Sequence, residues 1–441
     1  MEVKDRSLIS LSWPLILTFG IATVQPMMDS WFLAKTSENA AAGVGALMPL
    51  LGALFMAIQA FSQAGASIAS QFLGAHKKRK ASVTQTMVLT GSLLLGFSLT
   101  FIVLPLSETL VRLMGLSGET ALFAEDFLNV VSFGFAFRAL QTTLTALIAT
   151  HGLTVWNLFG NVLTILSNAL LNILFLNGYF GLPSLGVKGV ALATLSSWLI
   201  SSVILGLVLR YKVHYKTRTS DFSRLRLILP NWIRIGLPAA AEPVSFQLFQ
   251  VCITAMVVHF GTLAMTSRVF SANFAMLAVI LSVGLGSGNQ ILVAHLVGAH
   301  DFTKADKRLH QSLCASVLGA FLVALLVAVS GEHLLSVYTQ NEAILKLGKM
   351  CLWCDVFLQP FKAANVVLTN ALRASGDSKF PAVVGTLMMW TLGLSSAILL
   401  GFYFELGLIG LWIGMALDEF YRSIVNYRRW KSGKWQKYCL T

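Results

Sequence analysis

Asp29 is a carboxylate within an apolar, otherwise uncharged run of residues, three positions after Pro26. An acid inside a membrane helix is costly unless it faces a cavity, is paired, or holds a proton. Burial disfavours the charged form of a carboxyl group, so such a residue can bind and release a proton near neutral pH. Proton binding is therefore the chemistry that we expect of Asp29. The structural alternative is an ion pair with Lys35 at the outer end of the helix.

The partners of Asp29 should come from the same half of the chain. Asn168 and Asn172 are four residues apart and so lie on one face of a helix. Thr194 and Gln141 are weaker candidates, because polar side chains in membrane bundles also serve simply to hold helices together.

Pro14 and Pro26 act through the backbone. Each removes an intrahelical donor and can kink the helix that contains it. We expect Pro14 to be architectural, and we expect a bend at Pro26 to be the mechanical response to protonation of Asp29.

Further charged and aromatic residues lie inside apolar runs. Arg138 and Lys362 occupy equivalent positions in the two halves, where each can pair with an acid or a carbonyl oxygen. Glu242 and Asp355 are interpreted as the remaining intramembrane acids. A lipophilic cation would also need an apolar, aromatic-lined cavity. The residues that we expect to line it are Phe135, Phe246, Phe249 and Met256.

Composition requires a membrane to position these residues. Of 441 residues 56% are hydrophobic and 12% are charged, whereas a soluble domain carries about 25% charge. Soluble globular proteins are thus excluded, and the length accommodates about 12 helical crossings. The predicted segments are 7–33, 41–75, 82–106, 122–149, 153–178, 186–210, 231–260, 264–298, 307–330, 343–374, 380–402 and 407–430.

The net charge of +13 fixes orientation rather than indicating nucleic acid. Most Lys and Arg residues fall at the N-terminus, in alternate loops and in the C-terminal tail, which predicts both termini on the cytoplasmic side of a bacterial inner (plasma) membrane. We expect a basic cytoplasmic linker at 211–230 and a basic tail at 431–441. Nucleic acid is not an expected partner.

The two halves match at an offset of 224 residues: Pro14 falls on Pro238, and Gly74-Ala75-His76 falls on Gly298-Ala299-His300. A repeat with an even number of helices keeps its orientation, so the halves should be related by a pseudo-twofold axis along the membrane normal. The predicted fold is an all-α polytopic membrane protein with 12 transmembrane helices in two six-helix bundles, 1–210 and 231–430.

Several motifs, in this order, resemble the multidrug and toxic-compound extrusion (MATE) family, and more closely its DinF-like branch. They are Trp13-Pro14, Met27-Met28-Asp29-Ser30, Ala69-Ser70-Gln71-Phe72-Leu73-Gly74-Ala75-His76, Gly236-Leu237-Pro238 with Glu242, Ala294-His295-Leu296-Val297-Gly298-Ala299-His300, and Arg373-Ala374-Ser375-Gly376-Asp377-Ser378-Lys379.

This resemblance implies an antiporter that exports organic, often cationic drugs in exchange for protons or sodium by alternating access. We expect no resident cofactor or metal. It places the proton-titrating acid at Asp29 and matches Glu242 to a family glutamate. Proton-coupled members carry an Asp where this chain has Asn172, which leaves Asp29 as the strong proton acceptor of its half. Sodium-coupled relatives have a carboxylate where this chain has Lys362, and a cation there would repel sodium. We therefore expect proton coupling, and a monomer.

Two other functions are weighed against this one. A lipid-linked oligosaccharide flippase of the same superfamily typically has fourteen helices, more than the twelve predicted here. An intramembrane enzyme would need a catalytic pattern such as Gly-x-Ser-x-Gly or His-Glu-x-x-His, which the sequence lacks. The sequence thus favours a transporter that is not an enzyme, with the sodium-coupled exporter as the nearest alternative.

Overall fold

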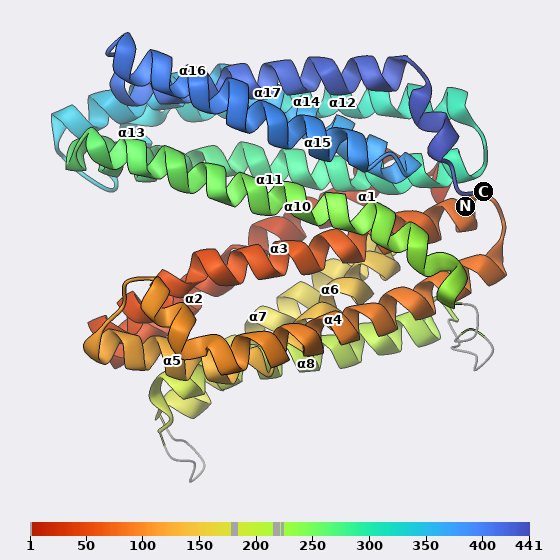
Figure 1. Ribbon diagram of the computed structural model, residues 1–441, viewed down its shortest axis with the longest axis horizontal. Helices are drawn as coiled ribbons and strands as arrows, with labels where there is room; N and C mark the ends of the chain where they lie inside the picture. The colour runs from red at the N-terminus through yellow and green to blue at the C-terminus, as the bar shows by residue number, and fades with distance from the viewer. Residues whose placement is uncertain (1, 178–183, 215–220, 222–224) are drawn as a thin grey trace. The chain divides into compact units, whose positions relative to one another are not determined.

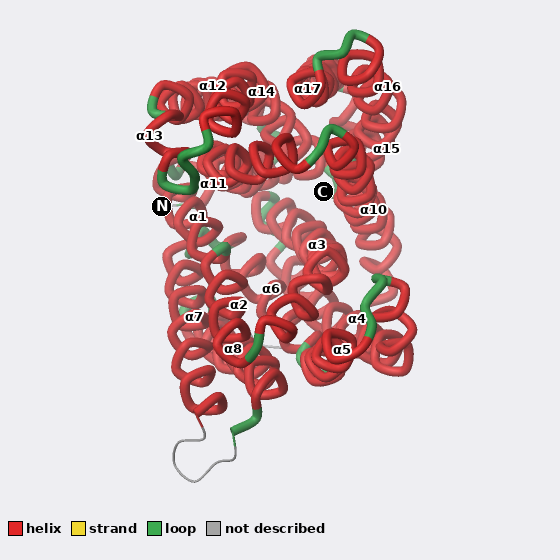
Figure 2. The backbone as a smooth tube through the Cα atoms, turned by 90° about the vertical axis from the view of Figure 1, so that its left-hand side faces the viewer, coloured by secondary structure: helices red, strands yellow, loops and turns green. Residues whose placement is uncertain are grey.

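The computed structural model describes residues 2–177, 184–214, 221 and 225–441, and every regular element in these ranges is a helix (Figure 2). In the first half the helices are η1 (Val3–Asp5), α1 (Leu8–Ala22), α2 (Val24–Thr36), α3 (Glu38–Gly74), α4 (Lys78–Leu113), α5 (Gly118–Ser132), α6 (Phe135–Thr150), α7 (Thr154–Asn177) and α8 (Gly186–Tyr211). In the second half they are α10 (Leu225–His259), α11 (Thr262–Gly298), α12 (Phe302–Val329), α13 (Gly331–Ser336), α14 (Glu342–Ser375), α15 (Lys379–Met388), η3 (Met389–Gly393), α16 (Leu394–Ile398), η4 (Leu399–Tyr403), α17 (Gly407–Lys431) and η5 (Lys434–Tyr438).

The chain forms two compact units. The first-half unit comprises Leu17–Ala69 and Lys77–Ala240. The second-half unit comprises Met1–Ile16, Ser70–His76 and Ala241–Thr441. The first turns of helix α1 and the end of α3 thus belong to the second-half unit. The division into lobes 1–210 and 231–430 stays a prediction about the repeat, and much of the predicted linker 211–230 lies outside the described residues.

One long helix organises each unit. In the first-half unit α8 packs against α5, α6 and α7, around a core that includes Phe135 and Trp198. In the second-half unit α14 packs against α11, α12 and α17 (Figure 1). These central helices carry several of the buried polar residues described below, among them Thr194 on α8 and Asp355 on α14.

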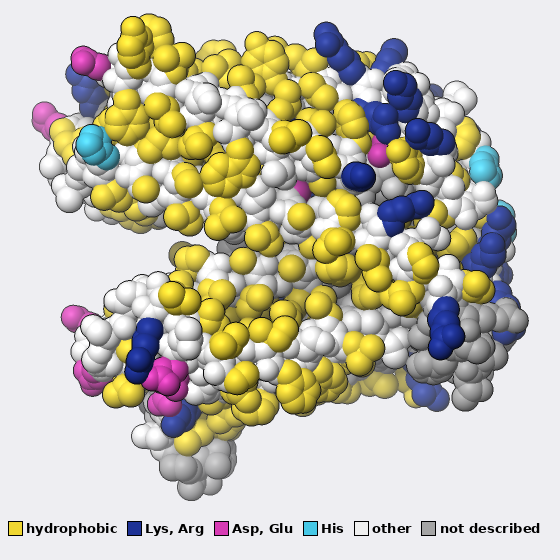
Figure 3. Space-filling view, viewed as in Figure 1, with side chains coloured by type: hydrophobic (Ala, Val, Ile, Leu, Met, Phe, Trp, Pro, Cys, Tyr) yellow, Lys and Arg dark blue, Asp and Glu magenta, His cyan; other side chains and the backbone are white. Residues whose placement is uncertain are grey.

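Large apolar side chains are exposed along the helices instead of being buried. Phe101 is 77% exposed, and Leu94, Leu326 and Phe357 are each about two-thirds exposed. In Figure 3 such side chains cover the middle of the helices, whereas in the second-half unit the Lys and Arg side chains in view gather mainly at the end that holds the chain termini. A surface of this kind suits the hydrocarbon core of a bilayer.

Nine helices in the described part of the chain are long and apolar enough to cross a membrane, and a bent pair raises the number to ten. The helices α14 and α17, both predicted as spans, do not meet this standard, and both carry buried charged side chains. Charged residues in the protein interior therefore explain why simple apolarity misses these two helices.

The prediction of one unbroken helix over residues 122–149 is wrong. This segment forms two helices, α5 and α6, which meet at an angle of 54°. The Ser132 carbonyl, at the break, accepts a 2.6 Å hydrogen bond from Thr100 Oγ1 of α4. Gly134 fits the corner because a Cβ atom there would lie 2.6 Å from that of Leu195.

Candidate functional site

The first candidate membrane span, Leu8–Thr36, which we call helix 1, is interrupted between α1 and α2, just before Pro26. Because Pro26 has no N–H group, the carbonyl of Ala22 loses its usual partner four residues on, and α1 ends at that residue. Thr23 stabilises the break, since its Oγ1 donates a 2.7 Å hydrogen bond to the Gly20 carbonyl. In contrast, α1 continues through Pro14. The break therefore coincides with the predicted hinge proline, Pro26, and not with Pro14.

Asp29 lies one turn beyond the break, on α2, and is 6% exposed. Its Oδ1 accepts a 3.0 Å hydrogen bond from Asn172 Nδ2 of α7, and its Oδ2 accepts a 3.3 Å bond from Thr194 Oγ1 of α8. Asn168 Nδ2 donates to Thr194 Oγ1 at 3.2 Å, and Asn168 Oδ1 accepts from Asn172 at 3.1 Å. The four residues predicted as a proton-coupling group thus form one buried cluster, which we call the Asp29 cluster.

The Asp29 cluster contains neutral hydrogen-bond donors and a single acid. Lys35, the alternative ion-pair partner, instead places its Nζ 3.8 Å from the centre of the Trp31 ring. Within the described residues no Lys, Arg or His forms a salt bridge with Asp29. The carboxyl group is therefore buried without a compensating cation.

Gln141 belongs to a different network of the same unit. Its Nε2 donates to Thr164 Oγ1 at 2.8 Å and to Ser201 Oγ at 3.2 Å, and its Oε1 accepts from Arg138 Nη1 at 3.0 Å. The structure thus separates Gln141 from the hydrogen bonds of Asp29, although both lie in the first-half unit.

In the second-half unit Glu242 and Lys362, both singled out from the sequence, contact different neighbours. Glu242 forms a 2.6 Å salt bridge with Arg373, at the end of α14. Lys362 lies with its Nζ 5.9 Å from the centre of the Phe246 ring. The Glu242 carboxylate is thus already neutralised by a cation of its own unit.

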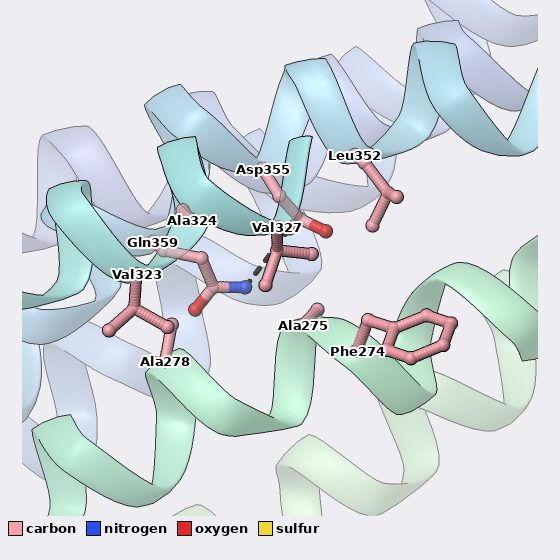
Figure 4. Close-up of a pocket in the computed structure, with 9 residues that line it drawn as sticks. All are labelled: Phe274, Ala275, Ala278, Val323, Ala324, Val327, Leu352, Asp355 and Gln359. Carbon is pink, nitrogen blue, oxygen red and sulfur yellow. Dashed lines mark hydrogen bonds between the residues drawn. The ribbon is translucent and has the colours of Figure 1, made fainter. Parts of the chain in front are cut away.

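Asp355 lines a small pocket between α11, α12 and α14. Apolar side chains such as Phe274 and Val323 form most of its wall. Figure 4 shows Asp355 and Gln359 on the same helix, joined by a 3.0 Å hydrogen bond from Gln359 Nε2 to Asp355 Oδ1. Asp355 Oδ2 has no hydrogen-bond partner.

Glu242 and Asp355 are not the only remaining intramembrane acids, which corrects that interpretation. Asp418 and Glu419 of α17 are also buried, and both accept 2.8 Å bonds from Arg422 Nη2. Asn365 Nδ2 donates to Glu419 Oε2 at 2.8 Å. The sequence does contain a signal for this group. Asp418 and Glu419 precede Arg422 by four and three residues, so the three side chains lie on one face of a helix and can pair.

The four residues expected to line a substrate cavity differ in exposure. Phe135 and Phe249 are buried in apolar cores, with 0% and 2% of their surface exposed. Phe246 and Met256 are half-buried beside the core of Phe249. In this conformation Phe246 and Met256 are thus the more accessible members of the set.

The sequence model of the MatE family matches residues 14–174 and again residues 238–399. The two matches begin 224 residues apart, which is the offset of the internal repeat. The chain belongs to the MatE family. MatE proteins are membrane transporters and not enzymes, so the expected class of protein is confirmed.

Curated relatives of this MatE chain match over nearly its whole length. The "Uncharacterized transporter YisQ" of Bacillus subtilis is 29% identical, over 98% of this chain and 95% of the relative. The "Probable multidrug resistance protein NorM" of Thermotoga maritima is 26% identical, over 98% of this chain and 93% of the relative. The likeness therefore covers both halves of the MatE repeat.

A solved structure supports the fold independently. The outward-facing conformation of a multidrug resistance MATE family transporter of the MOP superfamily superposes with a TM-score of 0.89. The match has 19% sequence identity and covers 98% of this chain and 96% of the other. The predicted all-α polytopic fold is thus confirmed, including the two helices, α14 and α17, that apolarity alone does not identify.

Proposed function

We propose that this MatE transporter exports organic compounds, including lipophilic cations, in exchange for protons. The family and the printed names of its multidrug-resistance relatives support drug efflux. The single observation that carries proton coupling is the Asp29 cluster, in which a buried carboxyl group meets neutral donors and no cation.

A proton suits the Asp29 cluster better than sodium. Both oxygen atoms of Asp29 face N–H or O–H donors, whereas hard metal cations are bound by several oxygen ligands. Lys362 of α14 would in addition repel a cation at the position where sodium-coupled relatives carry a carboxylate. The donors around Asp29 and the position of Lys362 thus both favour a proton over sodium as the coupling ion.

The break before Pro26 gives protonation a mechanical consequence. A proton on Asp29 removes its negative charge and changes its demand for the donors Asn172 and Thr194. Because α2 carries Asp29 and is separated from α1 by the break, α2 can shift relative to α7 and α8 without disrupting α1. In this proposal, protonation from outside bends helix 1 and releases the substrate, and the reverse steps complete alternating access.

The membrane arrangement follows from the basic loops. We propose that the protein is a monomer in the bacterial inner (plasma) membrane, with both termini in the cytoplasm. The Lys77–Lys80 run at the start of α4 and Lys304 at the start of α12 then face the cytoplasm, as does the C-terminal tail.

The coupling ion can be tested in proteoliposomes that contain the purified transporter and a fluorescent lipophilic cation. Substrate counterflow is measured under a proton gradient alone and under a sodium gradient alone. We expect the proton gradient to drive transport and the sodium gradient to have no effect. Sodium-driven transport that is insensitive to pH would overturn proton coupling.

A further inference from the structure

Arg138 is a half-buried cation that forms no salt bridge with any carboxylate of the described residues. It lies on α6, where its Nη1 donates to the Gln141 side-chain oxygen at 3.0 Å. Its Nε is fully enclosed and has no hydrogen-bond partner. The side chain as a whole is half-buried, so part of the guanidinium group remains accessible to a ligand.

No acid compensates Arg138 within its unit. The residues outside the described ranges include no Asp or Glu, so all the acids of the chain can be considered. In the first-half unit Asp126 pairs with Lys188, Glu108 pairs with Arg112, and Asp29 bonds Asn172 and Thr194. Among the described residues no carboxylate forms a salt bridge with Arg138.

Two aromatic rings flank the guanidinium group of Arg138. Its Cζ lies 5.3 Å from the centre of the Phe55 ring and 5.6 Å from that of Trp198. Phe55 and Trp198 also contact each other edge to face, with their ring centres 5.5 Å apart. Both rings are thus within cation–π distance of the guanidinium group.

An unpaired guanidinium in a membrane helix is expensive, and such residues normally pair or lie on a ligand pathway. Its planar set of N–H donors matches the two oxygens of a carboxylate. We propose that Arg138 binds the carboxylate group of exported aromatic compounds, an inference that rests on the proposed function and specifies its substrates.

The second half repeats this arrangement in part. Lys362 lies 224 positions after Arg138 and approaches the Phe246 ring. A cation next to an aromatic ring thus occurs at the same position of both repeats.

The test compares rhodamine B, which carries a free carboxylate, with its ethyl ester, which is identical except that the carboxylate is blocked. Binding to the detergent-purified full chain is measured by fluorescence polarisation, without any ion gradient. We expect the wild type to bind rhodamine B about tenfold more tightly than the ester, because a charge-assisted pair is lost with the ester. Arg138→Gln should abolish the difference, and Arg138→Lys should retain part of it.

Arg268→Gln is the matched control. Arg268 is also half-buried, and its Nη1 donates one hydrogen bond, to Thr254 Oγ1 of α10 at 2.7 Å. This variant should keep the preference for rhodamine B. If Arg138→Gln does not fold, Arg138→Lys still tests the inference, because its preference for rhodamine B over the ester should be smaller than that of the wild type.

Equal affinities of the wild type for the two dyes would overturn the inference, as would an unchanged preference in folded Arg138→Gln. Neither result would bear on proton coupling, which the gradient experiment tests separately. Conversely, a preference that depends on Arg138 in a protein that does not use protons would leave the carboxylate site standing and reject the coupling.

Discussion

At the scale of single residues, Asp29 differs from most other buried acids in its partners. Glu242 is paired with Arg373, Asp377 with Arg429, and Asp418 and Glu419 share Arg422. Adding a proton to any of these acids breaks an existing ion pair. Adding a proton to Asp29 changes only hydrogen bonds with neutral side chains. Asp29 can therefore gain and lose a proton without breaking an ion pair.

Asp355 is also a buried acid that forms no salt bridge among the described residues, and its surroundings differ from those of Asp29. One of its oxygens accepts from Gln359, and the other has no donor. Asp29, in contrast, has a donor at each oxygen, contributed by two different helices. Protonation of Asp29 therefore changes hydrogen bonds to both α7 and α8.

At the scale of elements, the break between α1 and α2 converts that chemistry into movement. Pro26→Ala would restore the N–H group that the Ala22 carbonyl lacks, and so favour a continuous helix. We expect efflux to fall on the order of tenfold, because a hinge sets the rate of the conformational step. Binding of the fluorescent cation to the detergent-purified protein should persist.

Pro105→Ala provides the control for this experiment. Pro105 lies inside α4, which continues without a break, and its side chain is exposed. It should transport like the wild type. Transport by Pro26→Ala at the wild-type rate in the same proteoliposomes would remove the hinge from the mechanism.

The elements also show what a sequence can and cannot predict. Apolar runs predict the long helices well, because each must bury its backbone in the bilayer. They do not predict the 54° bend between α5 and α6, which depends on Gly134 meeting a neighbouring helix. The spacing of Asn168 and Asn172 predicts that they lie on one face of α7. The spacing of Asp418, Glu419 and Arg422 allows them to pair but does not predict that all three are buried together.

At the scale of the whole molecule, the repeat produces a reciprocal contact within the second-half unit. A Cβ atom at Gly74 would lie 2.0 Å from the His295 carbonyl oxygen, and one at Gly298 would lie 2.0 Å from that of Gln71. These pairs are equivalent under the offset of 224 residues. The sequence predicts this symmetry from the repeated Gly-Ala-His motif, but only coordinates reveal that the two motifs touch.

Alanine at Gly74 or Gly298 should therefore destabilise the protein. The obstacle is backbone, which cannot move aside as a side chain can, and overpacking of this kind costs about 1–3 kcal/mol. Thermal unfolding in detergent should show a lower midpoint for either variant. Gly206→Ala is the control, since nothing lies within 4 Å of a Cβ atom at that position. An unchanged midpoint for Gly74→Ala and Gly298→Ala would mean that this contact is not maintained in the folded protein.

The central claim is that Asp29 couples proton movement to export. Its most direct test is proton-gradient-driven transport of a fluorescent lipophilic cation by Asp29→Asn in proteoliposomes, beside Asp126→Asn, which changes an exposed acid of the same unit paired with Lys188. We predict that folded Asp29→Asn transports no faster than protein-free liposomes leak, whereas Asp126→Asn matches the wild type. Transport by Asp29→Asn at the wild-type rate would contradict the account.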